Sequence, residues 1–251
     1  MFFISTYIEV LPIPYKIHIL IMKQYKKEFI NSLLENKALQ FGEFELNSRR
    51  KTPYFIDIGK FCNGDAIYRL GYFYAAKIND RFDQEEYDLI FGPAYKGIPL
   101  SVATAIVLNR DFNIKKRFAF NRKEPKKYGE KSSIVGKICD GDKIILVDDV
   151  ITTGKTKYDI INLLNSVANN LEYVGLIVSV DRQEIGEIGE NGTTAIEKFK
   201  KDAGIFVEYI VNISEIINYL WDTKKISKDE KEKIEIYLKK FGTGKVIEKY
   251  E

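Results

Sequence analysis

The 251-residue sequence contains one histidine and two cysteines, and both scarcities exclude classes of chemistry. Ser-His-Asp catalysis, Cys-His catalysis and HExxH zinc sites all need histidine, and His18 stands in a stretch without any such motif. Cys62 and Cys139 lie far apart, so a cysteine-ligated zinc site is excluded and a reducing compartment, the cytoplasm, is expected. The chemistry must therefore use Lys, Arg, Asp, Glu, hydroxyl and backbone groups.

Long apolar runs and an excess of one charge are also missing. Residues 1–21 are apolar but are interrupted by Glu9, Pro12, Pro14 and Lys16, and a bilayer span needs roughly 20 apolar residues. No basic segment of a signal peptide precedes them, so we expect a loosely packed extension and no membrane contact. With 39 Lys and Arg against 36 Asp and Glu, the net charge of +3 gives no indication of nucleic-acid binding.

Apolar runs with strand and helix periods alternate from Tyr87 to Ile213, which predicts an α/β fold with a central parallel sheet and crossover helices. Strands are expected at 87–92, 116–124, 143–150, 171–184 and 205–213, and the helices between them at 97–109, 155–170 and 194–204. Before this region we expect a helix at 23–39, a strand pair within 41–61 that turns near Ser48–Thr52, and a helix at 64–80. After it, helices are expected at 214–222 and 227–242, the second with a capping box from Ser227 to Glu230.

The stretch "KIILVDDVITTGKT", Lys143 to Thr156, resembles a nucleotide-binding loop but carries two adjacent acids. The Walker A motif of ATP- and GTP-binding proteins needs glycine at position 149, where this chain has Asp149. A carboxylate in the middle of a phosphate cradle repels the phosphate. The sequence therefore disfavours a nucleoside triphosphatase.

The two halves of this stretch suit different parts of a sugar phosphate. Asp148 and Asp149 follow an apolar run, where carboxylates can accept hydrogen bonds from a diol or bind Mg²⁺ through water. Hydroxyl and backbone N–H groups at the start of the next helix suit a monophosphate, and they belong to Thr152, Thr153, Gly154 and Thr156. A ribose 5-phosphate satisfies both halves, and the alternative is an ordinary turn with exposed acids.

This stretch resembles the phosphoribosyl pyrophosphate (PRPP) motif of the type I phosphoribosyltransferases. Four further segments resemble signatures of the orotate phosphoribosyltransferases, in the same order: "FGEFELNSRRKTPYF", "FGPAYKGIPL", "FNRKEPKKYGE" and "DRQE". The resemblance covers roughly Met22 to Gly242 and favours the monofunctional fungal and bacterial types. It implies the type I fold as one domain, 22–251, with a small hood built mainly from 22–62 and C-terminal helices at 213–242.

The implied reaction transfers 5-phosphoribosyl from PRPP to N1 of orotate. The products are orotidine 5′-monophosphate and pyrophosphate, in de novo pyrimidine biosynthesis, with Mg²⁺ as cofactor. The resemblance also implies a homodimer, in which a mobile loop of each subunit closes over the neighbour's site. Two alternatives stay open: a non-catalytic PRPP-binding regulator on the same fold, and a phosphoribosyltransferase for another nucleobase.

The resemblance assigns roles to individual positions. Arg122, Lys123 and Lys126 lie in the catalytic loop, with Lys126 as the main catalytic residue. Orotate would contact Phe55, Ile56, Thr152 and Arg182, although Arg182 could instead form a structural salt bridge. The positions matched to PRPP contacts are Asn47, Tyr95, Lys96, Arg122, Lys123, Lys126, Tyr128, Asp148, Asp149, Val150, Ile151, Thr152, Thr153, Gly154, Lys155 and Thr156.

Four positions depart from the family pattern. Asn47 stands where the family usually has Lys, Arg49 where it has Gly, Tyr128 where it has His, and Ile56 where it has Phe. Tyrosine can donate a hydrogen bond but cannot be a cation, so the contact of Tyr128 should depend less on pH near neutrality. We expect these changes to alter affinity while activity is retained, and Lys155 has no evident role.

Overall fold

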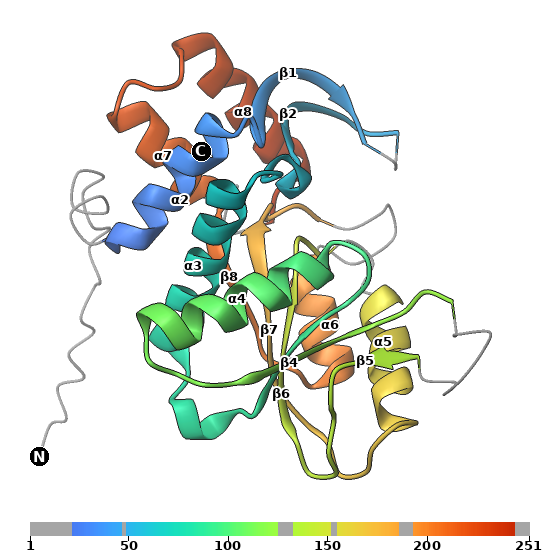
Figure 1. Ribbon diagram of the computed structural model, residues 1–251. Helices are drawn as coiled ribbons and strands as arrows, with labels where there is room; N and C mark the ends of the chain where they lie inside the picture. Colours follow the sequence, from blue (N-terminus) through green and yellow to red (C-terminus); the bar gives the residue numbers. More distant parts are fainter. Residues whose placement is uncertain (1–21, 47–48, 125–132, 152–154, 186–192, 244–251) are drawn as a thin grey trace, which may run out of the picture.

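The computed structural model describes residues 22–46, 49–124, 133–151, 155–185 and 193–243 (Figure 1). Six of its strands form one sheet in the order β5-β4-β3-β6-β7-β8, parallel except for β5, which pairs antiparallel with β4. The predicted α/β class is confirmed, but β5 was not expected because two residues are too short to show a period. The strands are β3 (Leu89–Gly92), β4 (Arg117–Asn121), β5 (Ile134–Val135), β6 (Lys143–Asp148), β7 (Glu172–Asp181) and β8 (Val207–Asn212).

The central strands are apolar on both faces because helices cover both faces of the sheet. Side chains alternate along a strand, so Ile90 and Ile145 face one core while Leu89 and Leu146 face the other. The first core includes α3 (Gly64–Arg81) and α4 (Gly97–Asp111), and the second includes α5 (Lys155–Asn165) and α6 (Ala195–Ala203) (Figure 1). All of these strand residues are fully buried.

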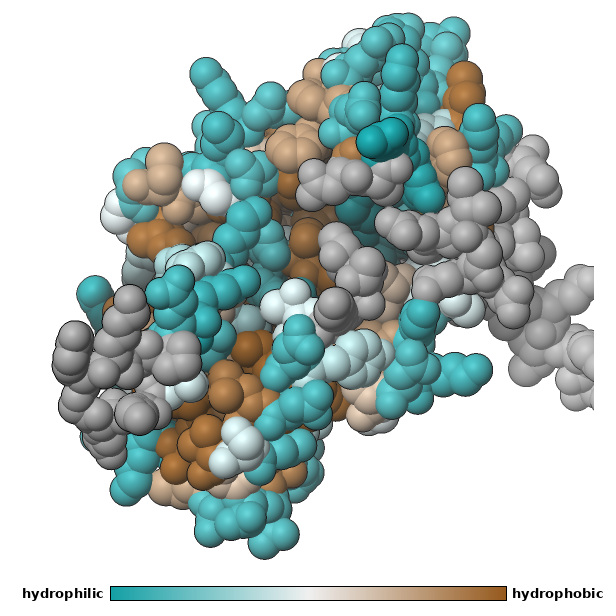
Figure 2. Space-filling model, turned by 90° about the vertical axis from the view of Figure 1, so that its right-hand side faces the viewer, coloured by the Kyte–Doolittle hydropathy of each residue, from teal (hydrophilic) through white to brown (hydrophobic). Residues whose placement is uncertain are grey.

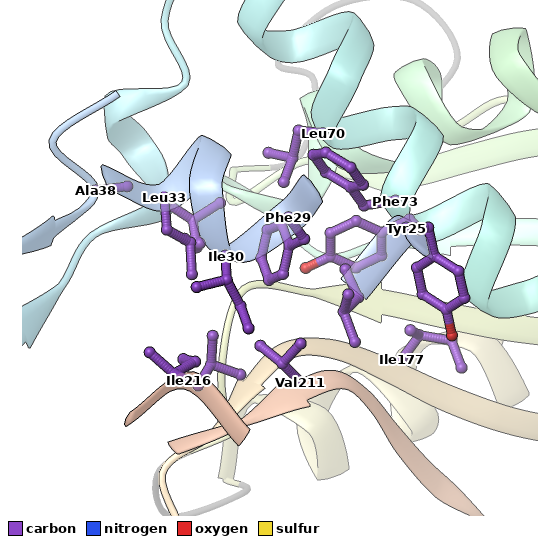
Figure 3. Packing of buried hydrophobic residues seen from close by; sticks show 14 of the residues in the cluster. Tyr25, Phe29, Ile30, Leu33, Ala38, Leu70, Phe73, Ile177, Val211 and Ile216 are labelled. Atoms are coloured by element: carbon purple, nitrogen blue, oxygen red, sulfur yellow. The ribbon is translucent and has the colours of Figure 1, made fainter. Parts of the chain in front are cut away.

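Helix α2 (Gln24–Glu35) packs into the first core through one apolar face. Phe29, Ile30 and Leu33 are fully buried, and Figure 3 shows them between residues of α3 and residues of β8 and α7 (Ile213–Asp222). The Phe29 ring lies 5.2 Å from the ring of Phe73 of α3. The sequence predicted that α2 would reach residue 39. It ends earlier because Lys37 adopts a left-handed φ of 53° and Leu39 begins the next strand.

A separate two-stranded antiparallel sheet, β1 (Leu39–Glu45) and β2 (Lys51–Ile56), forms the strand pair expected within 41–61. Its turn lies earlier than predicted, because Leu46 and Arg50 already pair through a 2.9 Å backbone hydrogen bond. Arg49 within this turn has a left-handed φ of 62°, a conformation that glycine adopts most easily. A glycine, which the resemblance implies at this position, would adopt this conformation without strain.

Helix α8 (Lys228–Phe241) begins with the predicted capping box, since Ser227 and Glu230 bond reciprocally. It packs on β2, and Figure 1 shows both at the end of the molecule toward which β7 points. The chain then pairs with the loop after β7: Ile185 N–H donates to Phe241, and Thr243 N–H donates to Gln183. The C-terminal segment thereby holds the loop of the "DRQE" motif.

The remaining bounds differ from expectation by a few residues. Helix α5 ends at Asn165 rather than 170, and two short 3-10 helices, η1 (Ile58–Lys60) and η2 (Gln84–Glu86), were not expected. Residues 1–21, expected to be a loose extension, lie outside the described residues. The division into hood and main domain stays a prediction. Within the described ranges, no helix has the length and apolar character needed to cross a membrane.

Candidate active site

The loops after β3, β4, β6 and β7 carry most of the residues matched to substrate contacts. These four strands are parallel neighbours, so their carboxyl ends meet at one edge of the sheet, where open α/β sheets bind ligands. Several predicted residues lie outside the described residues, as does the side chain of Lys155, and their assignments stay predictions: Asn47, Lys126, Tyr128, Thr152, Thr153 and Gly154.

Lys96 and Asp149, predicted from separate motifs, form an ion pair across this edge. Lys96 Nζ donates to Asp149 Oδ2 at 2.8 Å and lies 3.4 Å from Asp57 Oδ1. Partial burial of Lys96 disfavours its charged form, but the two carboxylates outweigh that effect and raise its pKa. Its side chain remains 52% exposed, so the ammonium can reach a ligand. Asp57, which was not predicted, holds this lysine together with Asp149.

The loop after β3 approaches α4 closely through two glycines. A Cβ on Gly92 would lie 1.8 Å from the carbonyl oxygen of Gly97, so any side chain here would displace the loop. The Ala94–Tyr95 peptide is cis, and Ala94 N–H donates to Asn121 Oδ1 of β4 at 2.8 Å. The two glycines therefore let the loop pass directly against the start of α4.

Asp148 differs from Asp149 because it is buried and bound to an unpredicted lysine. Its Oδ2 lies 2.7 Å from Lys157 Nζ, and its Oδ1 accepts the N–H of Asp149 at 2.9 Å. Burial raises the pKa of the Asp148 carboxyl, and Lys157 opposes part of that rise. Its predicted contact with ribose hydroxyls stays a prediction. Lys157 could have been found from the sequence, since it shares a helical stripe with Ile160 and Leu164.

Arg182 forms the salt bridge that the sequence left open as an alternative. Its Nε and Nη2 donate to Glu184 Oε1 at 2.9 and 2.8 Å, and its guanidinium lies 4.7 Å from the ring centre of Tyr54. Burial disfavours the charged guanidinium, but Tyr54 and Glu184 raise the pKa of Arg182 further. Tyr54 OH donates to the same Glu184 oxygen at 2.6 Å. Arg182 is therefore held rigidly at the end of β7, oriented by two residues that were given no role.

The two residues matched to the orotate ring lie on different faces of β2. Phe55 stacks on Phe44 of β1, with ring centres 5.5 Å apart. Ile56 lies on the face of Tyr54 and packs against the first core, because side chains alternate along a strand. The arrangement places Ile56 on the Arg182 side of the hairpin, and base contacts for either residue stay predictions.

Arg122 and Lys123 lead from β4 toward the predicted catalytic loop. Arg122 N–H donates to Ser133 at 2.7 Å, so the two described ends of this loop lie side by side. Lys123 Nζ lies 5.5 Å from the ring centre of Tyr95, which is 71% exposed. Tyr95, Arg122 and Lys123, all matched to PRPP contacts, are thus exposed at the same edge. Thr156 is exposed at the start of α5.

A cavity of about 410 Å³ borders Lys96. Its lining is mainly apolar and comes from Ile58, Gly59, 61–64, Ile67, Leu70, Pro99 and Leu100. An apolar lining does not suit a diphosphate.

Comparisons with known proteins identify the family of the chain. Residues 59–198 match the family model "Phosphoribosyl transferase domain". Orotate phosphoribosyltransferase of Clostridium beijerinckii is 43% identical over 228 residues, 88% of this chain and 99% of the relative. The relative from Aliivibrio fischeri, with the same name, is 41% identical over 88% of this chain and 100% of its own length.

A solved structure supports the same assignment. The crystal structure of orotate phosphoribosyltransferase from Francisella tularensis matches with a TM-score of 0.74 and 34% identity, covering 86% of this chain and 100% of the other. With the family model matching more than half of the chain and relatives above 40% identity along nearly their whole length, the chain belongs to the orotate phosphoribosyltransferases, pentosyltransferases of pyrimidine biosynthesis with the type I fold.

Proposed function

We propose that this chain transfers the 5-phosphoribosyl group of PRPP to N1 of orotate. The observation that carries the proposal is the ion pair between Lys96 and Asp149 at the edge where β3 and β6 end. A cation for the diphosphate and a carboxylate for the ribose stand next to each other there. In PRPP the anionic leaving group and the ribose hydroxyls are on neighbouring carbons. An enzyme that binds both therefore needs a cation and a carboxylate side by side.

In the reaction, the bond from orotate N1 to the anomeric carbon forms as the bond to the diphosphate oxygen breaks, and the proton on N1 is released to water. The diphosphate leaves with the bonding electron pair, so the enzyme must stabilise negative charge there. Lys96 would move from Asp149 to the diphosphate, and Asp149 would then accept a hydrogen bond from a ribose hydroxyl. Arg182, oriented by Glu184, would hold the orotate carboxylate.

Mg²⁺ is the proposed cofactor, and the residues fit a metal that arrives with the diphosphate. In the described ranges, no group of three or more His, Cys, Asp or Glu side chains could hold a metal by itself. Asp148 and Asp149 could contact such an ion through water, because Mg²⁺ often keeps its waters and binds phosphates with one or two carboxylates. When bound, the ion would neutralise charge on the departing diphosphate.

We also propose a homodimer in which the loop containing Lys126 and Tyr128 covers the partner's site. Apolar surface is available for an interface: Figure 2 shows apolar side chains gathered on the lower part of one face. Ile106 of α4 is 49% exposed and Phe118 of β4 is 39% exposed. Light scattering coupled to gel filtration would test the assembly. The cytoplasmic location inferred from the cysteines stays a prediction.

The test of the proposed function is the loss of orotate absorbance with purified protein. Consumption should require both PRPP and Mg²⁺, and uracil, hypoxanthine and adenine should not replace orotate. Lys126→Ala is expected to lower kcat by about a hundredfold or more while the chain still folds, since it removes a cation of the transition state. An unreactive wild-type protein, with PRPP bound, would favour the regulator instead.

A further inference from the structure

The buried lysine of α5 has a place in the site that no family motif gives it. Lys157 is 7% exposed and lies on the apolar stripe of α5 with Ile160 and Leu164, which are 5% and 0% exposed. Burying an ammonium is costly unless it is paired and hydrogen-bonded. Lys157 Nζ forms an ion pair with Asp148 Oδ2 at 2.7 Å and donates a hydrogen bond to the Val150 carbonyl at 2.9 Å. The charge of this lysine therefore acts on the loop after β6.

Lys157 completes a set of three contacts that fix successive carbonyl groups of this loop. The carbonyl of Asp148 accepts from Tyr74 OH of α3 at 2.7 Å. The carbonyl of Asp149 accepts from Ser179 Oγ of β7 at 2.6 Å and from its N–H at 3.0 Å. Lys157 holds the third carbonyl, that of Val150, from α5. Three elements thus determine the course of the backbone just before the phosphate-binding stretch.

The two adjacent acids of the loop are compensated in different ways. Lys96, the partner of Asp149, has a side chain 52% exposed and can move to a ligand. Lys157, the partner of Asp148, has a side chain 9% exposed and cannot leave without breaking a buried pair. One lysine is therefore exchangeable and the other permanent. A permanent partner also reduces the repulsion between Asp148 and an incoming phosphate.

We propose that Lys157 is a positioning residue for the ribose 5-phosphate end of PRPP, acting through the Asp148 carboxylate and the Val150 carbonyl. The inference rests on the proposed function, because its ligand is PRPP. Loss of Lys157 should therefore weaken PRPP binding and leave orotate binding unchanged.

The experiment compares Lys157→Met and Lys157→Gln with Lys77→Met. Lys77 is an equally buried lysine, 7% exposed, and pairs with Glu208 at 2.5 Å away from the loop. Each variant is measured for thermal unfolding, for kcat, and for KM of PRPP and of orotate. Lys157→Met should raise the KM of PRPP by about tenfold while the KM of orotate changes by less than about twofold. Lys77→Met should lower Tm and leave both KM values unchanged.

Lys157→Gln keeps an N–H donor without the charge and serves where the Met variant does not fold. It should raise the KM of PRPP by at least about threefold. If the folded Lys157 variants bind PRPP like the wild type, or if both KM values rise equally, the positioning role is refuted. An inactive wild type would instead refute the proposed function, so the two failures can be told apart.

Discussion

Glu184→Gln is the most informative test of how the base-binding side of the site is built. One oxygen of Glu184 accepts three hydrogen bonds, two from Arg182 and one from Tyr54. Its other oxygen lies 3.5 Å from Arg50 Nη1. Glutamine keeps the shape and one acceptor but removes the negative charge, so Arg182 would stay buried with its charge uncompensated.

The expected loss of stability is about 3 kcal/mol, the lower end of the range for breaking a buried ion pair. The range for buried pairs applies because the side chains of Arg182 and Glu184 are only 21% and 10% exposed. We take its lower end because glutamine retains a hydrogen-bond acceptor. For a chain of this size, 3 kcal/mol lowers Tm by about 6–12 °C. The KM of orotate should rise by about tenfold, because Arg182 loses its orientation, and the KM of PRPP should not change.

Circular dichroism melting and steady-state kinetics measure both effects. Glu232→Gln is the matched control, since Glu232 pairs with Lys228 on the surface, with side chains 56% and 80% exposed, and should leave Tm unchanged. The reasoning is refuted if Glu184→Gln melts within about 2 °C of the wild type and keeps its KM for orotate.

Two further substitutions test the interior near the site. Burial raises the pKa of the Asp181 carboxyl from 3.8 to about 6. Ionisation of Asp181 therefore costs the folded state about 3 kcal/mol. This cost is fully present above pH 6 and absent below pH 3.8. Asp181→Asn should therefore stabilise the chain in urea unfolding at neutral pH, and a gain that persists undiminished near about pH 4 would contradict this cause. Gly92→Ala should abolish turnover and lower Tm, because its Cβ would overlap the Gly97 carbonyl at 1.8 Å, whereas Gly64→Ala, with nothing within 4 Å, should do neither.

The sequence predicts the strands and helices well where apolar periods are long. Each core strand from β3 to β8 except β5 was expected, and the capping box at Ser227 was located correctly. The turn after β1 was placed too late, because Lys51 and Thr52 belong to β2 by pairing with the other strand. Such pairing depends on a partner that local sequence does not specify.

The site was predicted in part, because motifs give residues but not their partners. Lys96 and Asp149 were both predicted, yet their ion pair joins positions 53 residues apart. Tyr54 and Glu184 lie 130 residues apart, and nothing local links them. Lys157 was missed for a different reason, since its position on an apolar stripe was readable but was outside every motif.

The pairing of the C-terminal segment with the "DRQE" loop fixes the order in which the site can be assembled. Residues 241–243 close the loop that carries Arg182, and they follow it in the sequence. A ribosome makes the chain from the N-terminus, so the proposed ribose contacts, which need no residue after Ser179, are synthesised before the residues that close this loop. A nascent chain would therefore hold Arg182 in place only after residues 241–243 have been made.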